Sequence, residues 1–386
     1  MNDIYLDNNA TTLLDTRVLE AMLPTLAEVG NPASAHQAGQ RARNSVEEAR
    51  RQVAALLGSS ARELVFTSGS TESNNLALKG VARKAPGPRR RIVSVTTEHP
   101  SILRTLEALA GDGFEIVLVD VDSEGMIQLD SLRLAVNDET LLVTIMAANN
   151  ETGVLSPLAA IAEIAHDSGA LFHSDATQLL VWGGLDVEAA GIDLLSLSGH
   201  KMHGPQGVGA LYVRREVSRR LVAIQHGGGQ ERDLRSGTLN TAGIVGLGAA
   251  AELAQSEGPH VALRVRALRD ELHHGLLGRA SPVVLNGHLE QRLPGTLNLS
   301  FLGADAEAIM AGAPSVAIAT GSACSTGHPG PSHVLTAMGV DAEQAACSLR
   351  FGLSRFTSRE DVTTAATLVA ASASRVRDTS REAVAL

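Results

Sequence analysis

Short apolar runs alternate with longer amphipathic stretches through the first two thirds of the chain. The amphipathic stretches, for example 37–57 and 158–168, repeat apolar residues with the period of an α-helix. The apolar runs have the length of strands and span 63–67, 91–95, 115–119, 141–146, 171–174, 193–197 and 208–213. This alternation predicts an α/β fold in which helices cover a mostly parallel, seven-stranded sheet.

The pattern changes after about residue 245. A long helical stretch, 246–277, leads to a second set of strand-length runs, and a helix at 358–378 follows them. These later runs span 282–285, 295–301, 316–319 and 348–353. We therefore expect two domains: a large domain over 14–257, and a smaller α+β domain that combines 1–13 with 258–386.

Composition and charge narrow the class of protein. The chain has 386 residues, of which 44% are hydrophobic and 19% are charged, as in soluble globular proteins. A net charge of −10 and an aromatic content of 2% disfavour strong binding to nucleic acids, which need basic surfaces or aromatic platforms. The N-terminus lacks the apolar segment of a signal peptide, and no run approaches the ~18 apolar residues of a membrane span. We therefore expect a cytoplasmic protein that does not bind membranes directly.

The two cysteines have different surroundings. Cys347 lies beside a strand-like run, which favours a buried packing role. Cys324 lies in a segment rich in glycine, proline and hydroxyl residues, 320–331, which predicts an exposed loop. A thiol on such a loop is poorly placed for packing and well placed for reaction. Two thiols are too few for a zinc site, and we expect no metal centre.

Lys201 ends the sequence Ser198-Gly-His-Lys201, which directly follows the apolar run 193–197. A lysine at the end of a buried strand, flanked by small residues and a histidine, is typical of one that forms a Schiff base with pyridoxal phosphate. The alternative is a surface lysine in a hairpin. These four residues alone leave the two interpretations open.

Polar residues follow other predicted strands as well. Ser70 and Thr71 come after 63–67 and begin a helix, where free amides and the positive end of the helix dipole suit a phosphate group. His99 follows 91–95, at the edge of the sheet where ligands of α/β folds bind, and it could stack on a flat cofactor or exchange protons. The alternatives are a helix cap at Ser70 and a structural role for His99.

The next two strand ends supply the groups that a pyridine ring would need. Asp175 can pair with a pyridinium nitrogen, and Asn150 and Gln178 can bond to a ring oxygen. A turn at Asn150 or a helix cap at Asp175 is the alternative. Because groups of this kind recur at five consecutive strand ends, one shared cofactor site is favoured. Arg235 and Thr238, in a glycine-rich segment, could add phosphate donors or belong to a surface loop.

Taken together, nine segments resemble the cysteine desulfurases of the NifS/IscS type, which are class V of the fold-type-I enzymes that use pyridoxal phosphate. Their order and spacing match that family over nearly the whole chain. The segments are Tyr5-Leu-Asp-Asn-Asn-Ala-Thr-Thr12, Phe66-Thr-Ser-Gly-Ser-Thr-Glu-Ser73, Thr97-Glu-His99, Asn149-Asn-Glu-Thr-Gly153, His173-Ser-Asp-Ala-Thr-Gln178, Ser198-Gly-His-Lys201, Arg235-Ser-Gly-Thr238, Gly321-Ser-Ala-Cys324 and Leu349-Arg-Phe-Gly352.

The resemblance implies the type I fold of pyridoxal-phosphate transferases and a role for each matching residue. Lys201 would carry the cofactor, His99 would stack on its ring and take part in catalysis, and Asp175 would pair with the ring nitrogen. Thr238 would reach the phosphate in a neighbouring subunit, which implies a homodimer. The other contacts to the phosphate and the ring oxygen would come from Ser70, Thr71, Ser198, His200, Asn150 and Gln178.

The resemblance also implies the reaction. L-cysteine would bind through Arg350 and Asn150. Cys324, on a loop of the small domain, would take the substrate's sulfur as a persulfide, and the product would be L-alanine. The sulfur would pass to an acceptor protein, for iron–sulfur cluster assembly or for thio-modification of nucleic acid. The segment 201–207 resembles the desulfurases of DNA phosphorothioation systems.

The sequence is also compatible with two other kinds of protein. A selenocysteine lyase or another aminotransferase-like enzyme would share the cofactor residues, although an aminotransferase needs no thiol on a loop. A carrier that mainly docks partners would use Cys324 to hold sulfur or a cluster made elsewhere. The complete set of cofactor residues argues against the carrier.

Overall fold

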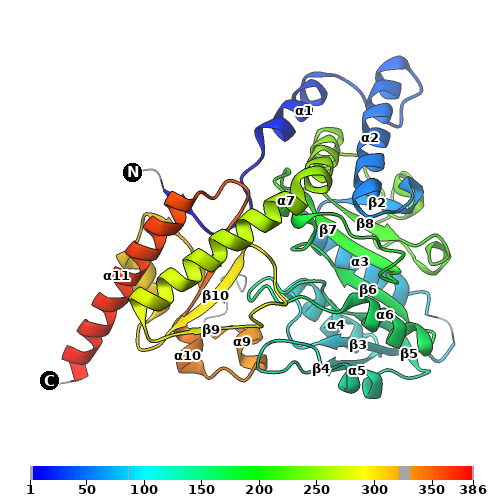
Figure 1. Ribbon diagram of the computed structural model, residues 1–386. Helices are drawn as coiled ribbons and strands as arrows, with labels where there is room; N and C mark the ends of the chain where they lie inside the picture. Colours follow the sequence, from blue (N-terminus) through cyan, green and yellow to red (C-terminus); the bar gives the residue numbers. More distant parts are fainter. Residues whose placement is uncertain (1–2, 86, 321–330, 385–386) are drawn as a thin grey trace.

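A seven-stranded sheet forms the centre of the larger part of the molecule (Figure 1). The computed structural model describes residues 3–85, 87–320 and 331–384, without the side chains of 380–384. In spatial order the strands are β2 (Leu64–Thr67), β8 (Gly209–Val213), β7 (Leu194–Ser198), β6 (Leu171–Asp175), β5 (Thr140–Thr144), β3 (Arg91–Val95) and β4 (Glu115–Val119). β8 is antiparallel to both neighbours, and the other four pairs are parallel. The predicted mostly parallel sheet is confirmed, with strand limits within two residues of those expected.

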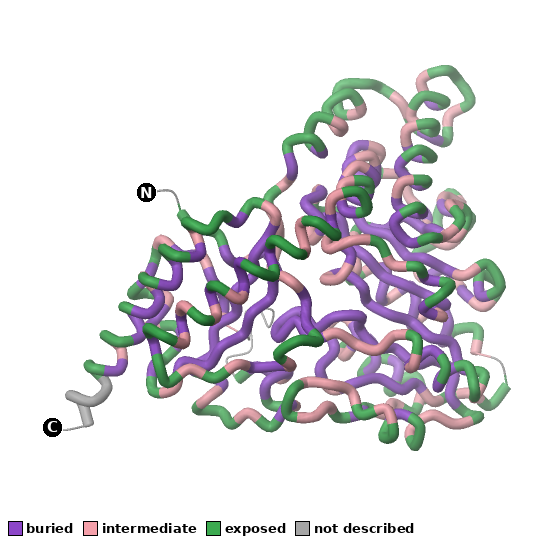
Figure 2. Tube along the Cα trace, in the orientation of Figure 1, coloured by how far each residue is buried: buried purple, intermediate pink, exposed green. Residues whose placement is uncertain are grey.

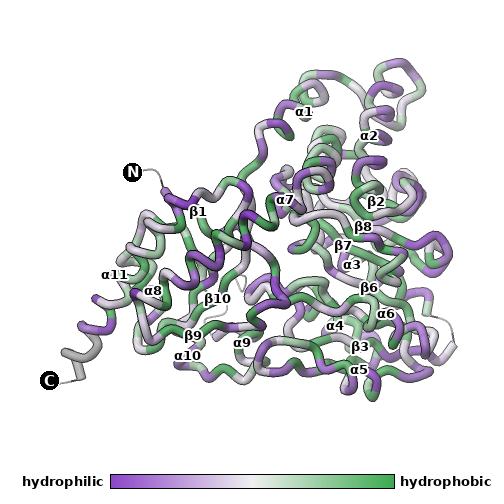
Figure 3. The backbone as a smooth tube through the Cα atoms, in the orientation of Figure 1, coloured by the Kyte–Doolittle hydropathy of each residue, from purple (hydrophilic) through white to green (hydrophobic). Residues whose placement is uncertain are grey.

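Helices bury both faces of this sheet because alternate strand residues point to opposite sides. Val93 and Phe172 pack in one core with α2 and α7, whereas Ile92 and Leu171 pack in another core with α3 and α4. Most of the strands are accordingly buried along their length and hydrophobic in sequence, whereas the edge strand β4 is only partly buried (Figures 2 and 3). The helices of this part are α1 (Thr16–Ala27), α2 (Gln37–Leu56), α3 (Ser70–Ala82), α4 (Pro100–Gly111), α5 (Leu129–Ala135), α6 (Leu158–Asp167) and the first half of α7 (Thr241–Ala280).

A smaller antiparallel sheet lies beside the large one. Its strands are, in order, β12 (Ala319–Thr320), β13 (Ser348–Gly352), β10 (Thr296–Phe301) and β9 (Val283–Leu285). The helices around it are α8 (Ala306–Gly312), α9 (His333–Ala337), α10 (Ala342–Ala346) and α11 (Arg359–Val384). The single strand expected at 316–319 is wrong: β11 (Val316–Ala317) pairs with β1 (Ile4–Tyr5), and the chain then changes partner so that β12 pairs with β13.

Helix α7 contributes to a core on one face of the large sheet and to a separate core between the small sheet and α11. Its residues up to Ala254 pack over the large sheet, whereas Val265 and later residues pack against the small sheet and α11. Pro259, which cannot donate a helical hydrogen bond, lies between the two halves. We propose that the two domains divide close to this residue. Within the described ranges, no helix is both long and apolar enough to cross a membrane.

Candidate active site at the carboxyl edge of the sheet

The carboxyl ends of the parallel strands surround one cavity of about 350 Å³. Because parallel strands end at the same edge, residues distant in sequence meet there. The lining residues are Ala10, Ser70, Thr71, His99, Met146, Ala148, Asn150, Asp175, Thr177, Gln178, His200 and Lys201. A second cavity of about 390 Å³ shares Ser70, Thr71 and His200 with the first and adds Ser198. The structure thus brings together most of the site residues expected from the sequence.

Lys201 lies on the short turn Gly199–Lys201 that directly follows β7. Its Nζ donates hydrogen bonds to the main-chain oxygens of Asn9 and Ala10, the latter at 2.8 Å. These acceptors belong to the segment after β1, which crosses from the small sheet to the large one. The amine is therefore held inside the cavity by both parts of the molecule.

Asp175, the last residue of β6, is buried and held by two donors. Its Oδ2 accepts a hydrogen bond from Nδ2 of Asn74 at 2.7 Å, and its Oδ1 accepts one from the amide of Thr177 at 3.0 Å. Asn74 was not expected from the sequence, although it lies four residues after Ser70 and so on the same face of α3. The carboxylate is fixed in place and can pair with a cation in the cavity.

His99 caps the N-terminus of α4 through its ring. Its Nδ1 accepts the amide hydrogen of Ser101 at 3.1 Å, so a neutral ring carries its proton on Nε2. Burial lowers the pKa of His99, and the charge of Lys201 lowers it further, although Asp175 opposes the shift. The ring is therefore neutral near pH 7 and offers an Nε2–H donor.

Glu98, immediately before this histidine, is fully buried. Its Oε1 accepts the amide hydrogen of Met146 at 2.5 Å, and its Oε2 has no partner among the described residues. Burial, and then the nearby charge of Asp175, raise the pKa of Glu98 well above its usual value. Burial and the charge of Asp175 thus favour the protonated form of this carboxyl, a feature that no pattern in the sequence indicated.

The region shared by the two cavities combines the N-terminus of α3 with a neutral histidine. Among the residues that the structure describes, no side chain caps α3, which begins at Ser70 after Gly69, a residue whose φ of 150° suits glycine. Its first amides are therefore available to an anion. Burial, with a smaller effect of Lys201, lowers the pKa of His200 to about 4. His200 can therefore act as a neutral donor to a phosphate group.

Two predicted residues, Thr238 and Arg350, stand apart from the two cavities. Thr238 is exposed, and Arg350 is buried; neither is among the described residues that line these cavities. The guanidinium of Arg350 donates to Oδ1 of Asp7 at 2.8 Å and to the main-chain oxygen of Asn150 at 3.1 Å. Arg350 thus contacts the cavity wall from behind. Cys324 lies outside the described residues.

The remaining expectations concern one arginine and one cysteine. Arg235, considered as a phosphate donor, instead forms an ion pair with Glu72 at 2.7 Å, because this opposite charge lies beside it on the first turn of α3. Cys347 is buried and carries a free thiol, as its surroundings in the sequence indicated.

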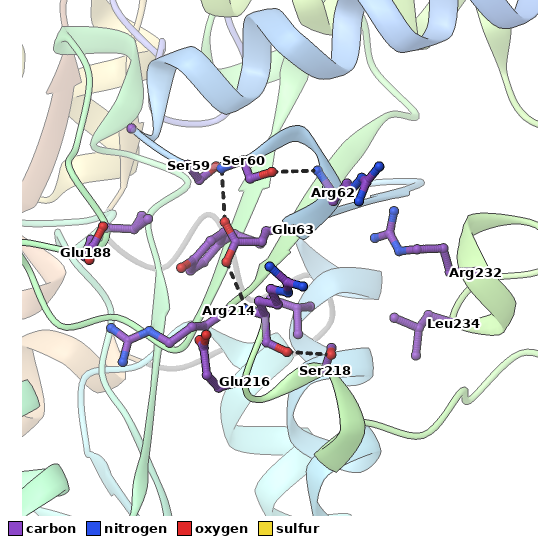
Figure 4. Close-up of a pocket in the computed structure, with 15 residues that line it drawn as sticks. Ser59, Ser60, Arg62, Glu63, Glu188, Arg214, Glu216, Ser218, Arg232 and Leu234 are labelled. Atoms are coloured by element: carbon purple, nitrogen blue, oxygen red, sulfur yellow. Dashed lines mark hydrogen bonds between the residues drawn. The ribbon is translucent and has the colours of Figure 1, made fainter.

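A larger cavity, of about 830 Å³, opens at the opposite edge of the sheet, where β2 begins and β8 ends (Figure 4). Its polar groups mostly bind one another or the main chain. Glu63 accepts the amide hydrogens of Ser60 and Arg215, and Arg232 donates to the oxygen of Leu64. No lysine is among the described residues that line it. The chemistry expected from the sequence therefore belongs to the smaller cavity.

The groups around the smaller cavity fit pyridoxal phosphate. The cofactor needs an amine for its aldehyde, an anion for its ring nitrogen and donors for its phosphate. Lys201, Asp175 and the N-terminus of α3 supply these at one cavity. Two histidines that stay neutral add donors without adding charge.

Comparison with known proteins agrees with this donor set. The family model described as aminotransferase class-V matches residues 4–364. The cysteine desulfurase IscS of Anaeromyxobacter sp. (strain Fw109-5) is 49% identical over 379 residues, which cover 98% of this chain and 94% of that protein.

Solved structures resemble the fold over nearly all of its length. A NifS-like protein superposes with a TM-score of 0.90 at 37% identity and covers 97% of this chain and 100% of its own. DndA from Streptomyces lividans superposes with a TM-score of 0.77 at 39% identity, covering 89% of this chain and 98% of its own.

Proposed function

Because the chain belongs to the class-V aminotransferase family and is a cysteine desulfurase that depends on pyridoxal phosphate, we propose that Lys201 binds this cofactor covalently at the cavity on the carboxyl edge of the sheet. The observation that carries the proposal is the convergence of an amine, a carboxylate and a helix N-terminus on one cavity: Lys201, Asp175 and Ser70. The chain adopts the type I fold of this enzyme class.

Each lining residue then has a task set by its chemistry. Asp175 pairs with the ring nitrogen, and His99 stacks on the ring. Asn150 and Gln178 bond to the ring oxygen, and Ser70, Thr71, Ser198 and His200 bind the phosphate. Bound in this way, pyridoxal phosphate supplies an electron-withdrawing ring that accepts the electron pair of the substrate's Cα–H bond.

The chain's own residues move the protons. With cofactor and substrate bound, Nζ of Lys201 would be the group that accepts the Cα proton and returns it to the substrate. Its present contacts, the oxygens of Asn9 and Ala10, keep it directed into the cavity. The Nε2–H of His99 is the second site at which a proton can be held near the ring.

We further propose that Cys324 removes the sulfur of L-cysteine. Its thiolate attacks the substrate sulfur, the C–S bond breaks, and the products are a persulfide on Cys324 and, after proton uptake, L-alanine. The residues that flank the undescribed segment support this role. Thr320 pairs with Leu349, next to Arg350, and Ser332 bonds to Glu151, next to Asn150. Arg350 and Asn150 are the groups proposed to bind the substrate.

A second copy of the chain completes the site in this proposal. Thr238 is exposed in the single chain, as a residue must be if it reaches a neighbour's phosphate. An apolar stripe on and just after α1 also lacks cover: Leu19, Leu23, Leu26 and Val29, spaced by three or four residues, are all exposed. We infer that α1 packs against the partner subunit of a homodimer.

The sulfur acceptor is, in this proposal, a protein that approaches the Cys324 segment. The net charge of −10 disfavours direct delivery to a nucleic acid. Relatives named IscS and DndA leave two routes for the acceptor: iron–sulfur cluster assembly and thio-modification of nucleic acid.

Reduction with borohydride tests the cofactor assignment. Peptide mapping of the reduced protein should find the pyridoxyl group on Lys201, and its presence on any other lysine would refute the assignment. Cys324→Ser should abolish alanine formation from L-cysteine, whereas Cys347→Ser, at the buried thiol, should retain it. Full alanine formation by Cys324→Ser would remove Cys324 as the nucleophile.

A further inference from the structure

Glu151 is a buried carboxyl that the reaction outlined above does not use. It follows Asn150 in the loop after β5 and is 1% exposed. Its Oε2 accepts a hydrogen bond from Oγ of Ser332 at 2.5 Å, and Ser332 also caps the N-terminus of α9. Its main-chain oxygen accepts one from Asn298 of β10 at 3.3 Å. The carboxyl is thus fixed between the large domain and the small sheet.

Arg350, which donates to the main-chain oxygen of the preceding residue, Asn150, at 3.1 Å, supplies the positive charge that acts on this carboxyl. Burial raises the pKa of Glu151 to about 7, although the hydrogen bond from Ser332 and the positive charge of Arg350 both lower it. Arg350 is also the partner of Asp7. The buried guanidinium of Arg350 is therefore shared by two carboxyl groups, those of Asp7 and Glu151, when no substrate is bound.

Two other side chains near Glu151 that can carry a charge, those of Arg292 and His333, bind main-chain oxygens. Arg292 donates to the main-chain oxygen of Thr152 at 2.6 Å, and Nε2 of His333 bonds to the main-chain oxygen of Glu98 at 3.0 Å. Neither of these contacts is to the carboxyl of Glu151. The charge balance around Glu151 thus depends on Arg350 and on what Arg350 binds.

We propose that Glu151 takes up a proton when the carboxylate of the substrate binds at Arg350, so that the guanidinium faces two negative charges rather than three. The inference rests on the proposed role of Arg350. Three ionised carboxylates around one cation would repel one another strongly in a buried site. A hydroxyl both donates and accepts, so Ser332 can keep its contact with the protonated carboxyl. Glu151 is in this sense a positioning residue that acts through Arg350.

The probe for this test is 3-mercaptopropionate, which has the carboxylate and thiol of cysteine but no amine to react with the cofactor. Its binding to the cofactor-loaded enzyme is measured by calorimetry between pH 6 and 8.5, in two buffers of different ionisation enthalpy. If binding raises the pKa of Glu151 by one unit, the dissociation constant rises about sevenfold across this range. The calorimetry should also show proton uptake near pH 7.5.

Two glutamate variants isolate the group responsible. Glu151→Gln should lose both the pH dependence and the proton uptake, because its amide cannot take up a proton. Glu163→Gln, on the exposed side of α6, is the matched control and should keep both. An unchanged pH dependence in Glu151→Gln would overturn the proposal.

Ser332→Ala gives a second, independent test. It removes a hydrogen bond that lowers the pKa of Glu151, so the midpoint of the pH dependence should move upward. A midpoint that stays in place would contradict the proposal.

Arg350→Gln separates this inference from the function on which it rests. If this variant binds the probe as tightly as the wild type, Arg350 does not bind the carboxylate and both proposals fall. If Arg350→Gln weakens binding while Glu151→Gln keeps the wild-type pH dependence, the role of Arg350 stands and only the role of Glu151 is overturned.

Discussion

Asn74 donates a hydrogen bond from Nδ2 to Oδ2 of Asp175 at 2.7 Å, and the same nitrogen lies 2.9 Å from Oγ of Ser101. Ser101 in turn bonds to Nδ1 of His99 at 2.8 Å. The residue proposed to pair with the ring nitrogen and the residue proposed to stack on the ring are therefore joined by side chains from α3 and α4. Neither connecting residue contacts the cofactor in the proposed assignment.

Asn74→Ala should weaken cofactor binding. The variant removes a donor to the buried Asp175 carboxylate, and a hydrogen bond to a charged group contributes roughly 1.5–3 kcal/mol, or about ten- to a hundredfold in affinity. The dissociation constant of pyridoxal phosphate, measured by absorbance titration, checks this. Asn75→Ala is the control, because among the described residues that side chain donates to the Thr71 carbonyl of its own helix and not to Asp175. Equal affinities in the two variants would show that Asn74 does not support Asp175.

The sequence identified most residues of this site because of one geometric rule. Polar groups at the ends of parallel strands must meet at one edge, so strand prediction alone brought His99, Asn150, Asp175 and Lys201 together. The apolar runs of the large sheet were reliable because most of its strands are buried on both faces and form nearly continuous hydrophobic segments, with the edge strand β4 as the exception.

The supporting contacts could not be predicted in the same way. The bonds from Lys201 to the oxygens of Asn9 and Ala10 join residues more than 190 positions apart and depend on how the two domains meet. The bond from Ser332 to Glu151 spans 181 positions and follows no periodic pattern. The change of pairing partner between β11 and β12 was missed because four apolar residues look the same whether one strand or two contain them.

His203 should make the protein sensitive to acid. Its Nδ1 donates to the oxygen of Leu13 at 2.9 Å, its Nε2 has no partner among the described residues, and burial lowers its pKa to about 4. Between pH 6.5 and 4 the unfolded chain binds a proton at this residue and the folded chain does not. The free energy of unfolding therefore falls as the pH drops through this window, by up to about 3 kcal/mol for a shift of this size.

Urea unfolding at pH 7 and pH 4.5 measures this effect. His203→Asn should reduce the loss between the two pH values, since asparagine carries no titratable group and tolerates the φ of 60° found here. His260→Asn, at an exposed histidine, should behave as the wild type. A loss that is as large in His203→Asn as in the wild type would assign the acid sensitivity to other groups.

Glu151 should have the opposite effect on stability. Its folded pKa of about 7 lies above the usual value of 4.5, so between these values the folded chain holds a proton that the unfolded chain has lost. The free energy of unfolding therefore falls as the pH rises from about 4.5 to 7, and the cost, about 3 kcal/mol for a shift of this size, persists above pH 7.

Thermal unfolding without any ligand tests this prediction. Glu151→Gln should gain stability relative to the wild type at pH 8 and little at pH 4.5, because only the ionised carboxyl is penalised by burial. The Glu163→Gln control should show no such difference between the two pH values. If the stability difference between Glu151→Gln and the wild type is the same at both pH values, the carboxyl does not titrate in this range.

The carboxylate of Glu231 should stabilise the turn 231–233, which lies in the same segment as Thr238. Glu231, Arg232 and Asp233 all have positive φ, from 49° to 63°, a conformation that disfavours residues with a Cβ. The buried carboxylate of Glu231 offsets this by binding Arg50 at 2.6 Å and the amide of Phe66 at 2.7 Å.

Glu231→Ala would leave the amide of Phe66 without its acceptor and the buried Arg50 without its main carboxylate, although Arg50 keeps Glu47 and the Leu64 oxygen. We expect this to cost about 3–5 kcal/mol in the free energy of unfolding measured with urea. Glu107→Ala, at the exposed ion pair with Arg104, should change stability by roughly 1 kcal/mol or less. Similar losses in the two variants would mean that the Glu231 contacts do not hold the strained turn.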